Sequence, residues 1–402
     1  MVQKSLFSFF SSRSNSVKFM VQEKHIIFCP VCGTHCCHHA YVENGKVVRI
    51  EPALNLALER GFPCDPCTTA KGIRTILGVL NSPDRLKFPL KRVGKRGEGK
   101  WRRISWDEAL DTIARKLLEI KDKYGPESVA ILIGEPKGLE FAFAQRFATA
   151  FGTPNVATPG TYCGVQTGHA LYSTFGSAGV QARMESNPRV IMVWGSNFAH
   201  IGGTFVGTTK RQIYEAIEKG CKLIVVDPRD TEIWPAKGWT ASNKAILWLR
   251  PRPASDGVLA MGMIKVIVEE KLYDEDYIAN WTVGFDELQK HVKTFTLEEV
   301  EKLTWVPKEQ IKEAARLYAT NKPGIIGWGN ALEQTVCAFQ ACRAIAILRA
   351  LTGNVNTPDG AEFEVEPAPM TRPGRFMLGG KLKERLRQYP RSAERTVGGE
   401  FK

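Results

Sequence analysis

Four cysteines near the start of the sequence have the spacing of metal ligands. Cys29, Cys32 and Cys36 are separated by two and three residues, and Cys64 follows after a further twenty-seven. Thiolates select iron-sulfur clusters, zinc or Cu(I), and a short cysteine run with a distant fourth ligand is typical of a 4Fe-4S cluster. The spacing predicts such a cluster, with structural zinc as the alternative and with Cys67 as an alternative fourth ligand.

Length and composition describe a globular protein. The 402 residues are 43% hydrophobic and 24% charged, and no long apolar run is present, so we expect no membrane-spanning helix. The net charge of +13 comes without a nucleic-acid motif, so we expect an anionic cofactor or an acidic redox partner and no nucleic acid. Ten clustered cysteines indicate a reducing compartment. Since residues 1–24 carry no export signal, we expect the protein in the cytoplasm.

The order of sequence patterns predicts an α/β protein. After a disordered extension over residues 1–24, residues 25–89 contain a hairpin signal at Asn44-Gly45 and form the expected small β-rich iron-sulfur domain. Over residues 90–356, short apolar runs alternate with amphipathic segments, which predicts doubly wound parallel α/β sheets. Residues 357–402 are rich in Pro, Gly and charge and are expected to be a tail or a truncated linker.

The apolar and amphipathic periods also give expected bounds. Strands are predicted at residues 128–133, 190–194, 223–226, 245–249 and 324–327. Helices are predicted at residues 69–80, 141–151, 208–219, 256–270, 308–319 and 336–352. Another helix begins after Ser105, where Glu108 completes the pattern of a capping box.

Two of these strands are followed by residues suited to a phosphate-bearing ligand. After the strand at 190–194, Gly195 allows a diphosphate to approach the backbone, and Ser196 and Asn197 offer uncharged donors. Asp227 follows the next strand, at the carboxyl edge where open α/β sheets bind ligands. A strand-end turn and a capped loop are the alternatives. Asp256 opens a helix and is either its N-cap or a ligand contact.

In this order, the segments resemble the molybdopterin oxidoreductase (dimethyl sulfoxide reductase) family over residues 25–360. The resemblance implies that residues 90–356 form an α/β region that binds two molybdopterin guanine dinucleotides, which hold molybdenum or tungsten. It is carried by the cysteine run, Trp194-Gly195-Ser196-Asn197, residues 223–231 with Asp227-Pro228-Arg229, Arg250-Pro251 with Asp256-Gly257, and residues 350–354. The implied dinucleotide contacts are Trp194, Gly195, Ser196, Asn197, Asp227, Pro228, Arg229 and Asp256, with Asp227 at the guanosine.

The resemblance also implies a protein ligand to the metal. Family members usually supply one Cys, Sec, Ser or Asp from a loop that corresponds to residues 159–164, so we expect Cys163 to bind the metal; a buried inert cysteine is the alternative. His169, six residues on, is a candidate proton donor. Most family members carry Lys two residues after the fourth cluster cysteine, whereas Pro66 stands there in this chain and Lys71 is the substitute.

The resemblance implies two-electron oxidation or reduction of a small-molecule substrate, with electrons passed through the cluster. Its details are most similar to acetylene hydratase-like members, at residues 104–110, 123–128, 220–225 and 272–274. However, Gly33 stands where the hydratase carries an Asp that activates water, and Gly164 stands where formate dehydrogenase-like members usually have His. We therefore expect an oxidoreductase, with a non-redox hydratase or a cofactor-free scaffold subunit as alternatives.

Family members commonly run longer and end in a β-barrel domain that completes the cofactor site. We therefore expect this chain to be a fragment or one part of a split enzyme, with a degenerate copy as the alternative. A second polypeptide would supply the missing domain, and an electron-transfer subunit would exchange electrons with the cluster.

Overall fold

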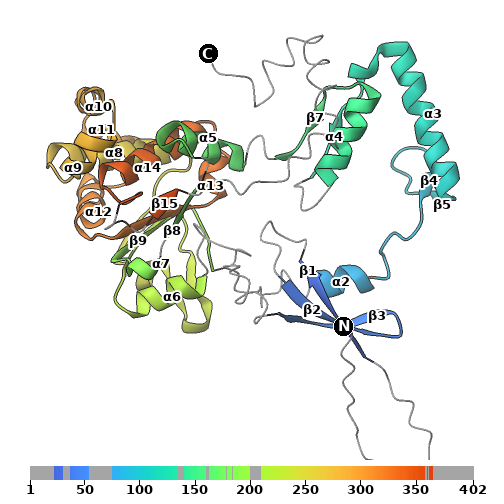
Figure 1. Ribbon diagram of the computed structural model, residues 1–402, viewed down its shortest axis with the longest axis horizontal. Helices are drawn as coiled ribbons and strands as arrows, with labels where there is room; N and C mark the ends of the chain where they lie inside the picture. Colours follow the sequence, from blue (N-terminus) through green and yellow to red (C-terminus); the bar gives the residue numbers. More distant parts are fainter. Residues whose placement is uncertain are drawn as a thin grey trace, which may run out of the picture. The chain divides into compact units, whose positions relative to one another are not determined.

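The computed structural model describes residues 22–29, 37–53, 75–134, 140–159, 163–177, 179–182, 184–199, 210–357, 360 and 362–364. These residues belong to two compact units, the first ending at residue 159 and the second beginning at residue 163 (Figure 1). Each unit has its own sheets and helices.

The first unit begins with a three-stranded antiparallel sheet. Its strands are β1 (Glu23–Phe28), β2 (Cys37–Glu43) and β3 (Lys46–Pro52), in the order β1-β2-β3. Asn44 and Gly45 connect the last two strands with φ angles of 50° and 73°. Positive φ at both central residues is what a tight two-residue hairpin needs, so the expected β-rich N-terminal region is confirmed.

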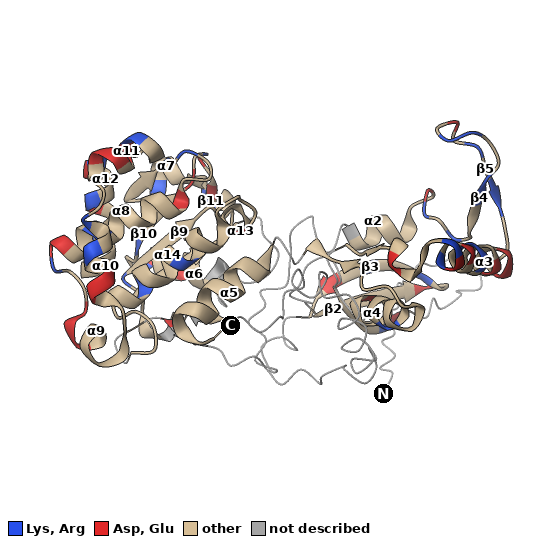
Figure 2. Cartoon of the chain, turned by 90° about the horizontal axis from the view of Figure 1, so that it is seen from above, with Lys and Arg blue, Asp and Glu red and all other residues tan. Residues whose placement is uncertain are grey.

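The remainder of the first unit is a series of short elements. Helix α2 (Thr75–Asn81) is followed by the antiparallel pair β4 (Leu90–Arg92) and β5 (Trp101–Arg103), whose strands carry Lys and Arg (Figure 2). Helix α3 (Trp106–Tyr124) comes next. Strands β6 (Ile131–Leu132) and β7 (Val156–Ala157) then pair in parallel, and helix α4 (Glu140–Phe151) connects them. Ser128, the first residue of the strand predicted at 128–133, instead ends a 3-10 turn that begins with Pro126.

Half of the predicted capping box at α3 is formed. The Ser105 hydroxyl accepts a hydrogen bond from the backbone N–H of Glu108 at 3.0 Å, as an N-cap does. The carboxylate of Glu108 does not complete the reciprocal bond. It lies instead 3.3 Å from the ammonium group of Lys91 and 3.4 Å from the guanidinium of Arg102, because the neighbouring β4–β5 pair brings two cations to it.

The second unit is organised around a four-stranded parallel sheet. Its order is β13 (Leu247–Leu249), β10 (Lys222–Val226), β9 (Val190–Trp194) and β14 (Gly324–Trp328). The chain passes from β9 outward to β10 and β13 and then returns to the other side of β9 at β14. A ligand crevice of a doubly wound sheet lies where the strand order reverses, which is between β9 and β14.

Helices cover both faces of this sheet (Figure 1). One face packs against α8 (Asp256–Glu269), α12 (Lys308–Thr320) and α14 (Ala338–Leu351), and the other against α6 (Lys210–Glu218). Every residue of β9 is buried, as expected for a central parallel strand. The other helices are α5 (Gly164–Phe175), α7 (Ala241–Lys244), α9 (Glu275–Trp281), α10 (Phe285–Val292), α11 (Leu297–Thr304) and α13 (Asn330–Glu333).

Two short antiparallel pairs complete the second unit. β8 (Val180–Ala182) pairs with β15 (Glu362–Glu364), and β11 (Glu232–Trp234) pairs with β12 (Trp239–Thr240). The predicted fold class, a small β-rich domain followed by parallel α/β structure, is confirmed. Within the part of the chain that the structure describes, no helix is both long and apolar enough to cross a membrane.

Candidate functional site

The ends of β9 and β14 approach each other closely at the carboxyl edge of the sheet. Gly329 donates its N–H to the carbonyl of Trp194 at 3.0 Å. A Cβ at Gly329 would lie 2.9 Å from the Cα of Ser196, and a Cβ at Gly195 would lie 2.9 Å from a methyl group of Leu332. Gly195 also has a positive φ of 53°. Glycine at both strand ends therefore keeps the crevice narrow and its backbone accessible.

Two polar side chains border this crevice. Ser196 is buried, and the side-chain oxygen of Asn197 is buried without a hydrogen-bond partner in the described part of the chain. A buried polar atom without a partner costs free energy unless a ligand or water satisfies it. The arrangement fits a bound group that donates a hydrogen bond to Asn197.

Asp256 is not the N-cap of α8, because Ser255 holds that position. The Asp256 carboxylate instead accepts a hydrogen bond from the indole N–H of Trp194 at 2.8 Å, which joins α8 to the end of β9. Burial raises the pKa of Asp256, the Trp194 bond opposes this, and the nearby charge of Asp227 adds to the increase. The carboxylates of Asp227 and Asp256 therefore lie near each other at the carboxyl edge of the sheet. A ligand with several N–H donors would stabilise both of them.

Asp227 follows β10, and its carboxylate accepts the backbone N–H of Arg229 at 2.8 Å. Burial raises the pKa of Asp227, while the N–H and the charge of Arg229 act to lower it. The Asp227 carbonyl accepts from the indole of Trp248 at 2.9 Å, and the guanidinium of Arg250 lies 4.9 Å from the centre of that ring. Pro228, Trp248 and Arg250 line a cavity of about 510 Å³. Pro228, the middle residue of the predicted Asp227-Pro228-Arg229 turn, thus borders a space large enough for a base.

Cys163 lies at the start of α5 and contacts a residue that the sequence did not indicate. Its thiol donates to the carboxylate of Glu333 at 3.8 Å. The other oxygen of Glu333 accepts from the hydroxyl of Thr167 at 2.5 Å, and Thr167 in turn accepts from the indole N–H of Trp328 at 3.0 Å. This network anchors Cys163 to the end of β14 through α13, the helix whose Leu332 borders Gly195.

His169 is partly buried on the same helix, but it is two residues beyond Thr167. Two residues correspond to about 200° around a helix, so His169 does not share the side that Thr167 presents to Glu333. Its predicted role as a proton donor stays untested. Thr167, Trp328 and Glu333 were missed because no pattern relates residues that lie far apart in the sequence.

The predicted cluster site is described only in part. Cys29 is buried directly after β1, whereas Cys32, Cys36, Cys64, Cys67 and Lys71 lie outside the described residues. Cys37, also buried, pairs with Phe28 across β1 and β2, so Cys37 lies opposite the residue that precedes Cys29. Both ring nitrogens of the neighbouring His38 are buried without a partner in the described part, and burial lowers its pKa. Successive residues of a strand point to opposite faces of its sheet, so the Cys37 thiol and the His38 imidazole do not face the same group.

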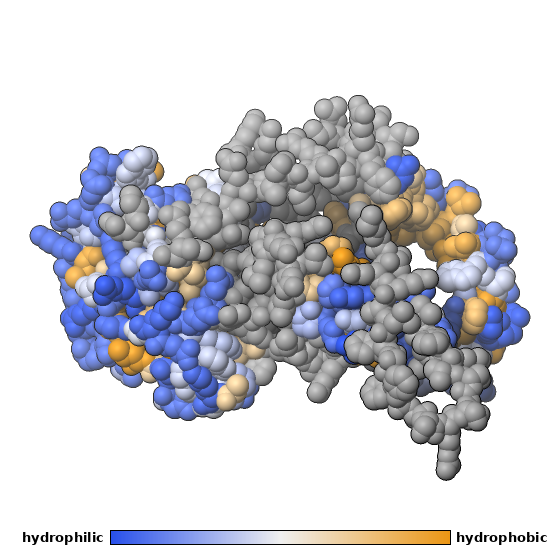
Figure 3. Space-filling model, turned by 60° about the horizontal axis from the view of Figure 1, so that its bottom comes forward, coloured by the Kyte–Doolittle hydropathy of each residue, from blue (hydrophilic) through white to orange (hydrophobic). Residues whose placement is uncertain are grey.

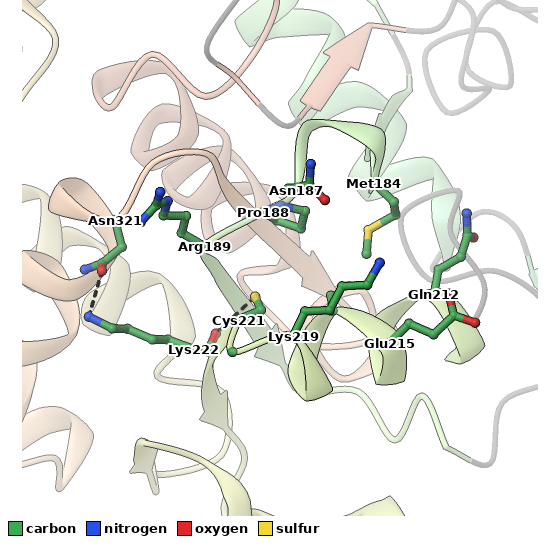
Figure 4. A pocket seen from close by; sticks show the side chains of 12 residues that line it. Met184, Asn187, Pro188, Arg189, Gln212, Glu215, Lys219, Cys221, Lys222 and Asn321 are labelled. Atoms are coloured by element: carbon green, nitrogen blue, oxygen red, sulfur yellow. Dashed lines mark hydrogen bonds between the residues drawn. The ribbon is translucent and has the colours of Figure 1, made fainter.

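A larger cavity, of about 710 Å³, lies at the opposite, amino edge of the parallel sheet (Figure 4). Arg189 and Lys222 border it, one residue before β9 and at the start of β10, and Lys222 donates to Asn321 at 2.7 Å. Cys221 also lines the cavity, and burial raises the pKa of its thiol to about 12. Such a thiol is a poor nucleophile and a poor metal ligand at neutral pH. The cavity brings together none of the predicted site residues.

Comparisons with known proteins identify the class that this fold and edge define. A model of the molybdopterin oxidoreductase family matches residues 85–394. The chain is 34% identical to acetylene hydratase of Syntrophotalea acetylenica over 86% of its length, and 32% identical to formate dehydrogenase H of Escherichia coli (strain K12) over 84%. It superimposes on the solved acetylene hydratase from Pelobacter acetylenicus with a TM-score of 0.72 and 30% identity, covering 90% of this chain.

The chain therefore belongs to the molybdopterin oxidoreductase family. It spans about half the length of the relatives it matches, since it covers 45% of each of the two enzymes and 48% of the solved structure. The relatives include hydratase, formate dehydrogenase and dimethyl sulfoxide reductase chains. Because these relatives are named for different reactions, membership of the family does not establish which reaction this chain takes part in.

Proposed function

We propose that this protein is the part of a molybdenum- or tungsten-dependent oxidoreductase that carries a 4Fe-4S cluster and contacts two molybdopterin guanine dinucleotides. The observation that carries the proposal is the carboxyl edge of the parallel sheet. Two strand-end glycines, an unsatisfied Asn197 oxygen and two carboxylates with raised pKa values meet there.

Each group at this edge has a physical role in the proposal. The backbone at Gly195 and Gly329 admits a diphosphate without steric conflict, and Asn197 accepts a hydrogen bond from the ligand. Asp227 and Asp256 can accept N–H groups, and guanine offers both a ring N–H and an exocyclic amine. These donors would favour the ionised carboxylates and so reverse the effect of burial on their pKa values.

Cys163 would bind the metal as a thiolate, a soft ligand that suits molybdenum or tungsten. The Glu333 carboxylate accepts a hydrogen bond from the Cys163 thiol, and Thr167 and Trp328 fix the orientation of that carboxylate. When bound, the metal centre supplies two-electron chemistry, and the cluster held by Cys29, Cys32, Cys36 and Cys64 exchanges single electrons. In this proposal the chain orients the cofactor, and the Glu333 carboxylate receives the proton that Cys163 loses.

Hydration is the second candidate, because the relatives include acetylene hydratase at 34% identity. We favour redox chemistry, since Gly33 offers no carboxylate to activate water. The same proposal includes a small-molecule substrate, an electron-transfer subunit as a partner, and a location in the cytoplasm.

The test uses the complete protein, purified without oxygen together with any polypeptide that accompanies it. A stepwise reduction followed by electron paramagnetic resonance should show a metal signal that changes shape in Cys163→Ser. When no electron acceptor is present, the protein should not convert acetylene. Acetaldehyde formation in the absence of an acceptor, with no substrate-dependent reduction of the metal, would replace the redox proposal by hydration.

A further inference from the structure

The proposed function makes no use of the cavity at the amino edge of the parallel sheet. Its volume of about 710 Å³ lies within the range of small-molecule sites, roughly 300–1,000 Å³. The turn before β9, the end of α6, the start of β10 and the residue after α12 form this amino-edge cavity (Figure 4). Figure 3, in which the bottom of Figure 1 comes forward, shows a mostly hydrophilic surface on the second unit, at the left. A polar ligand therefore suits this cavity better than an apolar partner.

Three cationic side chains line the amino-edge cavity, those of Arg189, Lys219 and Lys222. Within the described part of the chain, none of the three forms an ion pair, and Glu215 is the only acid among the lining residues. Glu218 precedes Lys219 but pairs with Lys237. Other cations of the same unit do have carboxylate partners: Lys265, Lys308, Lys312, Arg316, Lys322 and Arg349. The cavity thus concentrates positive charge that the described residues do not neutralise.

The ends of α6 and α12 lie at this edge, and helix carbonyl ends attract cations. However, their carbonyls have other donors. The N–H of Cys221 bonds to the carbonyl of Ala216 at 3.0 Å, as in a Schellman motif, and Gly220 makes the turn with φ 97°. The side-chain amide of Asn321 donates to the carbonyl of Leu317 at 2.8 Å. The two helix dipoles together offset only about one charge, so helix capping does not explain three cations.

Lys222 is held in place by a neutral partner. Its ammonium group donates to the side-chain oxygen of Asn321 at 2.7 Å (Figure 4), which occupies one of its three N–H donors. The backbone of Arg189 is also fixed, because its N–H donates to the carbonyl of Pro323 and its carbonyl accepts from the N–H of Lys222, both at 2.8 Å. Burial raises the pKa of Cys221 to about 12, so this thiol adds no negative charge. The cations are therefore anchored at the cavity without being neutralised.

We propose that the amino-edge cavity binds a phosphorylated small molecule through these three cations. A phosphate monoester carries roughly 1.5 to 2 negative charges at neutral pH and has three acceptor oxygens. The guanidinium of Arg189 offers such oxygens a fork of N–H donors, and the ammonium groups of Lys219 and Lys222 act as point charges. The cavity lies beyond the strand ends, so side chains from both faces of the sheet reach it. The organic part of the ligand lies against Met184 and Pro188. This inference does not depend on the redox reaction.

Isothermal titration calorimetry of the full chain with ribose 5-phosphate tests the proposal. We expect ribose 5-phosphate to bind, ribose not to bind, and inorganic phosphate to bind more weakly because it lacks the organic part. Arg189→Gln should raise the dissociation constant at least about tenfold, since charge-assisted hydrogen bonds are lost. Lys302→Gln is the matched control, because Lys302 is an exposed cation of α11 that does not line the cavity. It should change the dissociation constant by no more than about twofold, since distant exposed charges are screened.

Lys219→Gln is a second variant in the cavity and should also weaken binding. Arg189 and Lys219 are exposed, so without ligand both variants should melt at the same temperature as the unmodified chain. Absence of binding at millimolar ribose 5-phosphate would overturn the proposal, as would binding that neither substitution weakens. Equal weakening by Lys302→Gln would reveal a non-specific effect of charge and would contradict the site. Inorganic phosphate that binds as tightly as ribose 5-phosphate would mean that the cavity holds an ion only, which would overturn a phosphorylated small molecule as its ligand.

Discussion

Replacing the buried Arg349 by Met should destabilise the second unit by about 2–5 kcal/mol. Arg349 is 2% exposed on α14, and its guanidinium lies 3.2 Å from the carboxylate of Glu362. It also donates to the carbonyl of Ile326 in β14 and lies 4.5 Å from the ring centre of Trp328. Met keeps much of the volume and removes all three interactions.

The magnitude follows from what is left behind. A buried Ile326 carbonyl without a donor costs about 1–3 kcal/mol, and the loss of a desolvated cation over an aromatic ring costs about 0.5–2 kcal/mol. For a unit of this size each kcal/mol lowers the melting temperature by about 2–4 °C. The expected decrease is therefore about 4–20 °C by differential scanning calorimetry.

The matched control is Arg343→Met, on the same helix but exposed. It should change the free energy of unfolding by no more than about 0.5 kcal/mol. Equal melting temperatures for the two variants would refute the assignment of Arg349 as a structural anchor of β14 and of the Trp328–Thr167–Glu333 network.

The same pair predicts a pH dependence. Burial raises the pKa of Glu362 from 4.5 to about 7, against the opposing effects of the Arg349 charge and the Ile326 N–H. Between those values the folded chain retains a proton that the unfolded chain has lost, so the free energy of unfolding falls as the pH rises through this window. In Arg349→Met the pKa rises further, and the decline should extend to higher pH in urea unfolding curves. A decline that ends at the same pH in both proteins would contradict the coupling.

Three further variants test the carboxyl edge. Asp256→Asn should raise the melting temperature of the cofactor-free chain at pH 7, because burial disfavours the ionised carboxylate. The same variant should retain less guanine nucleotide on purification. A lower melting temperature would show that the charge of Asp256 is stabilising. Gly329→Ala should cost about 1–3 kcal/mol because its methyl group would crowd Ser196, whereas Gly134→Ala, with open space around it, is the control in urea unfolding. Thr167→Val should cost about 1–3 kcal/mol, since the hydroxyl that bonds to Glu333, to Trp328 and to the Cys342 thiol is lost; an unchanged melting temperature would argue against the network.

The elements that could be predicted are those whose signal is local. The apolar run at Val190–Trp194 gave β9 with the predicted bounds, and Asn44-Gly45 gave the hairpin between β2 and β3. The carboxyl edge could also be predicted in outline, because residues that follow parallel strands must gather at one edge. What could not be predicted was set by long-range packing: Glu333 meets a thiol 170 residues earlier in the chain.

Side-chain competition explains two further differences. Glu108 has the spacing of a capping-box residue, but two cations on the adjacent strand pair attract its carboxylate. Asp256 has the residue type and place of an N-cap, but the indole of Trp194 lies within hydrogen-bonding distance. In both cases a partner from another element decided the geometry, and a single sequence does not specify such partners.

The proposed function requires the carboxyl edge to hold guanine dinucleotides of a metal-binding pterin. The most direct test measures the metals and the nucleotides that acid releases from the complete protein purified without oxygen. We expect about one molybdenum or tungsten, two guanosine monophosphates and four irons for each chain, with the nucleotide lost when Asp227 and Asp256 are both replaced by Ala. Iron or zinc without molybdenum, tungsten and guanine nucleotide would contradict it.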